Sequence, residues 1–144
     1  MIAQIRPSEL SAWIQSLPAG AQPVVLDVRE PWEIQTASVP ADGFVLRAIP
    51  MQEIPARLGE LDADQPVACL CHHGARSQRV ALFLENQGFS QAVFISGGID
   101  AWSVEHDPAI PRYCSVPSPR KRSMSLLLPS FPLLSACLLA LVAS

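Results

Sequence analysis

The feature that most constrains the fold of this chain is a short apolar run that recurs four times. The runs occupy residues 23–28 (PVVLDV), 44–49 (FVLRAI), 66–71 (PVACLC) and 92–96 (AVFIS). Continuous apolar runs of this length are typical of strands buried on both faces, as in parallel sheets. Parallel neighbours need crossover connections, which lay helices over both faces of the sheet. The sequence therefore predicts a three-layer α/β fold with a central, mostly parallel sheet.

Helical patterns fill the segments around these runs. In residues 8–17, Ser8 is a candidate cap, and apolar residues recur with helical spacing before a Pro and a Gly end the pattern. A weaker pattern covers about 51–61, and a stronger one covers about 76–87 and ends at Gly88. The length of 144 residues and the hydrophobic content of 49% predict one domain with a buried core.

Charge and cysteine content narrow the functional classes. Residues 1–114 carry seven arginines against thirteen acidic residues, so this part has no basic surface of the kind that binds nucleic acid. The four cysteines are too few and too irregularly spaced for a disulfide framework, and no N-terminal signal precedes them; they are Cys69, Cys71, Cys114 and Cys137. We therefore expect reduced thiols and a cytoplasmic location.

Polar loops follow three of the predicted strands. They are LDVRE (26–30), CHHGARS (71–77) and SGGIDAW (96–102). Ligands of parallel sheets bind beyond the carboxyl ends of the strands, so we expect these loops to share one edge. Two of them also fit a purely structural role, because Asp27 can cap a turn and Gly97 with Gly98 can supply unusual backbone dihedrals. The loop that begins at Cys71 is harder to explain by geometry alone.

The Cys71 loop has the composition of an anion cradle. Four residues separate Cys71 from Arg76, Gly74 lets the chain turn tightly, and the loop opens into a predicted helix. Successive amide N–H groups can then point inward, and with the helix dipole and Arg76 they would stabilise negative charge at the sulfur. The same amides can hold an anionic substrate or the outer sulfur of a persulfide. The alternative, an inert cysteine packed before a turn, is weakened by the glycine and arginine at these offsets.

In this order and at these separations, three motifs resemble those of a single-domain rhodanese, a thiosulfate-type sulfurtransferase. They are LDVREPWE (26–33), CHHGARS (71–77) and SGGIDAW (96–102). The resemblance covers roughly residues 2–113 and implies a rhodanese-like three-layer domain in which Cys71 carries sulfane sulfur. It also implies a set of substrate-binding residues in the cradling loop, namely His72, His73, Gly74, Ala75 and Arg76.

The resemblance implies supporting residues as well. In this family the acidic residue of the DVRE segment braces the active-site region, so Asp27 and Arg29 are expected to support the site, together with Ser77. Trp102 is expected in the core. The sequence departs from the family at TASVPADG (36–43), where many members have a His-Ile-Pro-Gly-Ala stretch. This departure indicates a family variant and leaves the chemistry of Cys71 unaffected.

The reaction that the resemblance implies is a two-step relay. The Cys71 thiolate takes the outer sulfur of thiosulfate or another donor, sulfite leaves, and Cys71 becomes a persulfide. A thiophilic acceptor, such as cyanide or a thiol, then removes the sulfur. The expected partners are a small sulfur donor and this acceptor, with no metal, no organic cofactor and no nucleic acid. His72 and His73 are candidates for contact with the acceptor, against the simpler interpretation of solvated loop residues.

Three alternatives stay open at this point. A cysteine phosphatase or arsenate reductase-like enzyme also uses Cys and Arg, but its loop has one residue more between them, and no obvious general-acid Asp follows here. A metal site could use Cys69, Cys71, His72 and His73, since strand alternation places the two cysteines on one face. A non-catalytic interaction module is the third, because a fold alone never fixes function.

Composition predicts a domain boundary near Cys114. We expect residues 1–114 to form the sulfurtransferase domain, and 115–144 to be a Pro- and Ser-rich linker with a basic cluster and an apolar tail. Residues 123–144 lack charge, and their length permits membrane association, since roughly 20 apolar residues span a bilayer. The tail also resembles a secretory signal at the wrong end of the chain, which fits a fused or non-functional extension. A segment packed on a partner or on the domain is the remaining interpretation.

Overall fold

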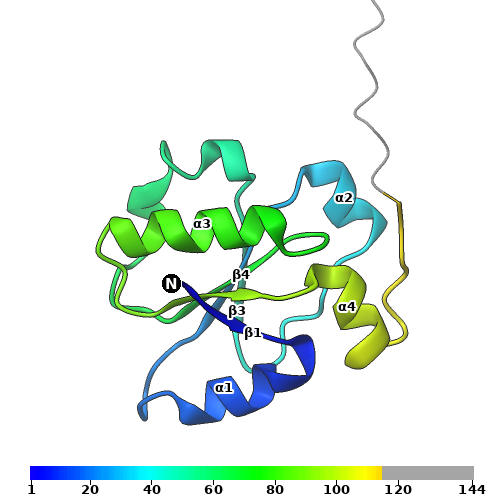
Figure 1. Ribbon diagram of the computed structural model, residues 1–144, viewed down its shortest axis with the longest axis horizontal. Coiled ribbons are helices and arrows are strands. Elements are labelled where there is room, and N and C mark those ends of the chain that lie inside the picture. Colours follow the sequence, from blue (N-terminus) through cyan, green and yellow to red (C-terminus); the bar gives the residue numbers. More distant parts are fainter. Residues whose placement is uncertain (115–144) are drawn as a thin grey trace, which may run out of the picture.

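Figure 1 shows the computed structural model of the protein, which describes residues 1–114. Its sheet has five strands: β1 (Ala3–Ile5), β2 (Val24–Asp27), β3 (Val45–Ala48), β4 (Val67–Leu70) and β5 (Ala92–Ile95). Their order across the sheet is β1-β5-β4-β2-β3, and every neighbouring pair is parallel. The predicted parallel sheet of an α/β fold is confirmed.

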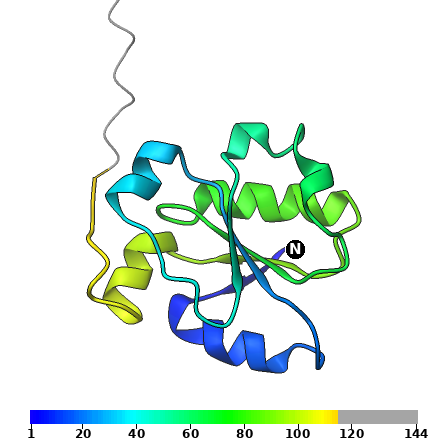
Figure 2. The same cartoon turned by 180° about the vertical axis from the view of Figure 1, so that it is seen from behind.

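Helices cover both faces of this sheet. Residues 1–114 form α1 (Leu10–Ser16), α2 (Pro31–Thr36), α3 (Ala75–Asn86) and α4 (Gly98–Glu105), with 3-10 turns η1 (Pro7–Glu9), η2 (Met51–Glu53) and η3 (Leu58–Glu60). Helix α3 lies on one side of the sheet, and α1 and α4 lie on the other (Figures 1 and 2). The side chains of β2 alternate accordingly: Val24 and Leu26 belong to the core under α3, and Val25 belongs to the core under α1 and α4. The predicted three layers are therefore present.

Two of the predicted helical segments are wrong in detail. Segment 51–61 forms η2 and η3 instead of one α-helix, because Pro55 has no N–H to donate to the Met51 carbonyl. The amide of Ile54 donates to that carbonyl instead, at 3.4 Å, as a 3-10 turn requires. Ser8 does not cap α1, because it lies inside η1, and its hydroxyl faces the Glu105 carboxylate at 3.5 Å.

The strands also differ from the sequence prediction in two ways. Residues 44–49 were predicted to be buried on both faces, but β3 is an edge strand with mostly exposed side chains. The reason is that α3 packs on β4 and β5, away from this edge. The short strand β1 and helix α2 were not predicted, since three and six residues are too few for a periodic pattern.

Residues 115–144 are not among the described residues. The interpretations of the apolar tail therefore stay predictions. Among residues 1–114, none of the helices has the length and apolarity to cross a membrane.

Candidate active site

The three polar loops meet at one edge of the sheet. Strand β4 lies between β5 and β2, and all three run in the same direction, so the segments after Ile95, Leu70 and Asp27 emerge side by side. Cys71 follows the central strand of the three. The edge expected from the sequence is therefore built around this cysteine.

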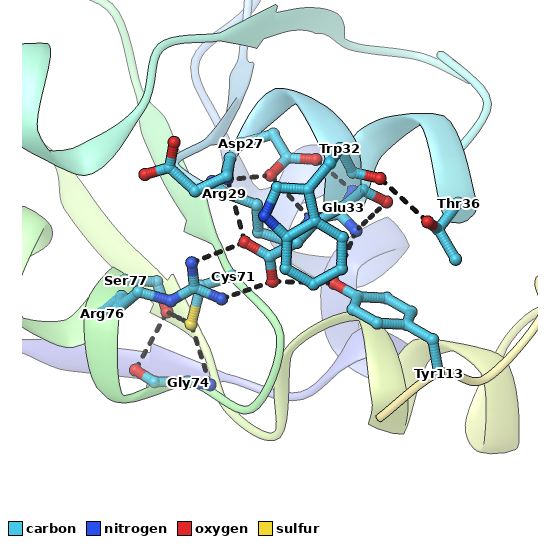
Figure 3. A network of polar contacts seen from close by, with 11 residues as sticks. Asp27, Arg29, Trp32, Glu33, Thr36, Cys71, Gly74, Arg76, Ser77 and Tyr113 are labelled. Atoms are coloured by element: carbon cyan, nitrogen blue, oxygen red, sulfur yellow. Dashed lines mark hydrogen bonds and ion pairs between the residues drawn. The ribbon is translucent and has the colours of Figure 1, made fainter. Parts of the chain in front are cut away.

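The sulfur of Cys71 is enclosed by the loop that follows it. The residue is 1% exposed. The Gly74 amide donates to Sγ at 3.0 Å, and the thiol donates to the Ser77 hydroxyl at 3.4 Å (Figure 3). The same hydroxyl donates to the Gly74 carbonyl at 3.0 Å. A backbone N–H directed at an atom is a fixed dipole that stabilises negative charge there.

Gly74 makes this enclosure sterically feasible. Its φ of +109° lies in a region that residues with a side chain rarely adopt. A Cβ at this position would lie 3.2 Å from the Gly97 amide nitrogen and 3.7 Å from the Ile95 carbonyl oxygen. The turn around the sulfur and its close approach to the segment after β5 therefore both favour glycine.

The start of α4 is hydrogen-bonded to the backbone of the Cys71 loop. The Ile99 and Asp100 amides donate to the carbonyls of Cys71 and His72 at 2.9 and 3.2 Å. Gly98 has a φ of +61°, and a Cβ there would lie 2.3 Å from the His72 carbonyl oxygen. The expected backbone role of this glycine is thus present, and close approach to the loop is a second reason for it.

Asp27 and Arg29 form a buried ion pair beside this loop. Arg29 is 0% exposed, and its Nε and Nη2 donate to the two carboxylate oxygens of Asp27 at 2.8 and 2.6 Å. The Arg29 amide also donates to Asp27 at 3.1 Å, so the carboxylate closes a turn as well. The turn-closing role of Asp27 is therefore present, and its supporting role in the site stays a prediction.

Glu33 joins α2 to the Cys71 loop, and the sequence analysis missed it. Its buried carboxylate accepts from both terminal nitrogens of Arg76 at 2.7 Å, from the Glu30 amide at 2.9 Å and from the Tyr113 hydroxyl at 3.1 Å (Figure 3). The only local signal is EPWE (30–33), since an early proline and a glutamate at the third helical position are typical of a helix start. The pairing with Arg76 has no local pattern.

Tyr113 was missed as well, and it closes the polar network. Its hydroxyl accepts from Arg29 Nη1 at 2.9 Å and donates to Glu33. Arg29 Nη1 also donates to the main-chain carbonyl of Glu33 at 3.3 Å. One connected set of hydrogen bonds therefore runs from Asp27 through Arg29, Tyr113 and Glu33 to Arg76.

Hydrogen bonding decides the charge of this network. Burial alone would raise the pKa of Glu33, but hydrogen bonds from Arg76 and Glu30 and the charge of Arg76 lower it to about 2. Burial raises the pKa of Tyr113 to about 12, against the opposing effect of Arg29. Near pH 7, Glu33 is therefore a carboxylate and Tyr113 a neutral phenol that donates to it.

Comparison with known proteins identifies the family. A model of the rhodanese-like domain matches residues 7–105. The chain belongs to the rhodanese-like family. A protein named sulfurtransferase from Allochromatium vinosum is 34% identical over 103 residues, which cover 72% of this chain and 90% of that protein. The thiosulfate sulfurtransferase GlpE of Stutzerimonas stutzeri is 33% identical over 95 residues, which cover 62% and 82%.

A longer relative and two solved structures agree with this membership. The rhodanese-like/PpiC domain-containing protein 12, chloroplastic, of Arabidopsis thaliana is 35% identical over 116 residues, which cover 78% of this chain but only 38% of that protein. A rhodanese-like domain protein from Staphylococcus aureus has a TM-score of 0.60 at 26% identity and covers 78% of this chain and 100% of its own. A rhodanese-related protein from Thermoplasma volcanium has a TM-score of 0.59 at 29% identity and covers 77% and 99%. The rhodanese-like fold is confirmed.

The two histidines of the rhodanese-like loop lie in different surroundings. His72 is buried, and its ring lies against those of His73, with centroids 3.8 Å apart, and Tyr113, at 4.1 Å and an interplanar angle of 6°. Burial and the neighbouring His73 lower the pKa of His72. His73 and Ala75 are exposed. The interpretation of both histidines as solvated loop residues is therefore wrong for His72.

Arg76 has a different immediate partner from the one that the sequence suggested. We expected its charge to act on the sulfur of Cys71, but its guanidinium forms a bidentate ion pair with the Glu33 carboxylate. These hydrogen bonds raise the pKa of Arg76. The residue thus ties the first turn of α3 to α2, and an additional direct effect on the sulfur stays a prediction.

The second cysteine of strand β4 is buried behind the site. Cys69 and Cys71 lie in the same core cluster, as strand alternation predicted. Burial and then the nearby Cys71 raise the pKa of the Cys69 thiol, which makes it a poor nucleophile. In the part of the chain that the structure describes, no three His, Cys, Asp or Glu residues gather as metal ligands would. The metal alternative therefore has no ligand set among residues 1–114.

Proposed function

We propose that this rhodanese-like domain is a sulfurtransferase that carries sulfane sulfur as a persulfide on Cys71. The observation that carries the proposal is the Gly74 amide directed at Sγ at 3.0 Å. An N–H in this position stabilises a thiolate and the terminal sulfur of a persulfide alike. Relatives named sulfurtransferase at 33–34% identity support sulfur transfer as the general reaction.

The proposed donor is thiosulfate or a similar anionic sulfane compound. The Cys71 thiolate attacks the outer sulfur, a new S–S bond forms as the old one breaks, and sulfite leaves with the electron pair of the broken bond. An acceptor thiolate or cyanide then attacks the outer sulfur of the persulfide, and the Cys71 thiolate leaves. Both steps balance without a redox co-reactant, and neither requires a metal or an organic cofactor.

The loop and its anchors have separate roles in this proposal. The Gly74 amide, which is directed at the sulfur, would face the donor together with the other amides of the loop, while Ser77 donates to the Gly74 carbonyl. The Asp27–Arg29 pair and Glu33 hold the surrounding segments in place. Binding in a preformed cradle of this kind avoids reorganisation during the reaction.

Two contacts argue against a cysteine phosphatase. The arginine that would hold a phosphate is occupied by Glu33. Asp100, whose amide donates to the loop at His72, has a carboxylate that accepts from Arg112 at 2.7 and 3.0 Å; these hydrogen bonds lower its pKa, so it is no proton donor near neutral pH. Phosphate or arsenate chemistry is therefore a much weaker candidate function than sulfur transfer.

The proposal is tested by thiocyanate formation from thiosulfate and cyanide. We expect Cys71→Ala to abolish it, and Cys69→Ala to retain most of it with a modest loss of stability. Cys69→Ala is the matched control for Cys71→Ala, because both cysteines are buried, Cys69 in strand β4 and Cys71 directly after it. An active Cys71→Ala protein would refute the mechanism and favour a different nucleophile. Equal inactivation of two folded variants would favour a dithiol or metal mechanism.

A further inference from the structure

The segment that leaves α4 returns to the active site. The Ser103 hydroxyl donates to the Ile110 carbonyl at 2.6 Å, and Arg112 pairs with Asp100 at the start of α4. Ile110 is buried in the core under α1 and α4. These contacts fix the path of residues 107–113 and bring Tyr113 up to the network, where its hydroxyl points at Glu33 (Figure 3).

Tyr113 contacts one end of the Cys71 loop directly and is linked to the other end through Glu33. Its ring is stacked on His72, the residue directly after the nucleophile, at 4.1 Å and 6°. Its hydroxyl donates to Glu33, which holds Arg76 at the far end of the loop. Trp32 supports the same ring edge-on, with centroids 6.2 Å apart. A rigid aromatic ring with a polar tip is well suited to fix two groups at once.

We propose that Tyr113 is a positioning residue for the nucleophile loop, so that the segment after α4 is a working part of the active site. The inference rests on the proposed persulfide chemistry of Cys71. Tyr113 lies outside residues 7–105, the part of the chain that matches the rhodanese-like domain model. It acts through His72 and the Glu33–Arg76 pair and holds the turn that directs the Gly74 amide at the sulfur.

The ring and the hydroxyl have separable contributions. Stacking on His72 restricts the residue between Cys71 and the turn at Gly74, and this depends on the flat ring. The hydroxyl adds one of the four hydrogen bonds that the Glu33 carboxylate accepts, and the other three come from Arg76 and Glu30. Loss of the ring is therefore expected to disturb Cys71 more than loss of the hydroxyl.

The experiment compares Tyr113→Leu, Tyr113→Phe and Ser103→Ala in the full chain. Two rates are measured at a temperature where each variant is folded: persulfide formation with thiosulfate in a single turnover, and alkylation of Cys71 by iodoacetamide. We expect Tyr113→Leu to slow sulfur loading by roughly tenfold or more, since small misplacements of reacting groups cost large rate factors. Tyr113→Phe should restore most of the rate.

Ser103→Ala is the matched control. It removes a buried hydrogen bond from the same exit segment, with Ser103 6% exposed, but its side chain contacts no member of the network. It should therefore lower the thermal midpoint and change either rate far less than Tyr113→Leu, because the burial of Ile110 and the pair of Arg112 with Asp100 still hold the segment. A rate loss equal to that of Tyr113→Leu would overturn the inference, because general loosening of the segment would then explain both.

A second measurement keeps the test decisive if Tyr113→Leu does not fold. The chain contains one tyrosine, so ring-labelled tyrosine gives a single set of NMR signals. We expect these signals to shift when thiosulfate loads Cys71 and to stay unchanged in Cys71→Ser. Signals that do not respond to loading, or a folded Tyr113→Leu with unchanged rates, would overturn the inference. If the unmodified chain takes up no sulfur, the proposed function fails, and the alkylation rates alone decide the role of Tyr113.

Discussion

The two terminal nitrogens of Arg76 each lie 2.7 Å from a carboxylate oxygen of Glu33. This pair joins the first turn of α3, directly after the Cys71 loop, to helix α2. The carboxylate also accepts from the Glu30 amide and the Tyr113 hydroxyl, so its oxygens are well satisfied although buried. Buried charge is tolerated only with such partners, and Glu33 is therefore a central support of the site.

Glu33 makes stability depend on pH in the acid range. Its pKa of about 2 in the folded protein lies below its ordinary value of 4.5, so the native state favours the carboxylate. The resulting stability, about 3 kcal/mol, is fully present above pH 4.5 and is lost as the pH falls towards 2. Urea unfolding of the unmodified protein and Glu33→Gln should therefore converge as the pH is lowered through this range.

The exposed pair of Glu60 with Arg57 provides the control. Glu60→Gln should change stability little at any pH, because exposed pairs are screened by water and salt. Parallel curves for Glu33→Gln and the unmodified protein across the acid range would show that Glu33 is not the linked group.

The buried pair of Asp27 and Arg29 should dominate the stability of this region. Asp27→Asn leaves the guanidinium of Arg29 buried without its counter-charge, and we expect a loss of about 3–5 kcal/mol in the free energy of unfolding. The double variant Asp27→Leu/Arg29→Met should be less destabilised than the single one, since it removes both charges. Chemical denaturation measures both effects, and a cost for Asp27→Asn no larger than that of the exposed change Arg57→Ala would contradict the account.

Gly98→Ala should damage the site beyond its backbone strain. The new Cβ would lie 2.3 Å from the His72 carbonyl oxygen and would push α4 from the loop. Gly43→Ala is the matched change, since Gly43 also has a positive φ of +76° but open space around it. We expect Gly43→Ala to cost about 1–2 kcal/mol and to leave Cys71 alkylation unchanged. Gly98→Ala should cost more and alter the alkylation rate; identical behaviour of the two variants would argue against the contact.

Truncation separates the exit segment from the tail. A chain that ends at Cys114 keeps Arg112 and Tyr113, so we expect it to fold and to transfer sulfur at a rate similar to the full chain. A chain that ends at Asp107 loses Ile110, the Arg112 pair and Tyr113, and should be less stable and slower. Thermal unfolding and thiocyanate formation measure both, and loss of folding or activity in the longer truncation would place the domain boundary further along the chain.

Much of the fold was predictable because its signals are local. The apolar runs at β2, β4 and β5 and the helical pattern of α3 indicate a parallel α/β sheet, and the loop after Cys71 carries its own Gly and Arg. The prediction of one α-helix over residues 51–61 failed because Pro55 alone removes a helical hydrogen bond within an otherwise suitable pattern.

The support of the site was not predictable in the same way. Glu33 meets Arg76 across 43 residues, and Tyr113 meets Arg29 across 84. Neither pairing leaves a periodic or spacing signal, because each depends on how the strands are ordered in the sheet. Asp27 and Arg29 were located through their motif, but their mutual ion pair and full burial follow only from the folded structure.

The most direct test of the central claim is the intact mass of the purified full chain before and after thiosulfate, with and without a thiol reductant. The account predicts a gain of one sulfur atom that maps to Cys71, is removed by the reductant and by cyanide, and does not occur in Cys71→Ala. An unchanged mass after thiosulfate and other sulfane donors, or sulfur bound equally by Cys71→Ala, would contradict it.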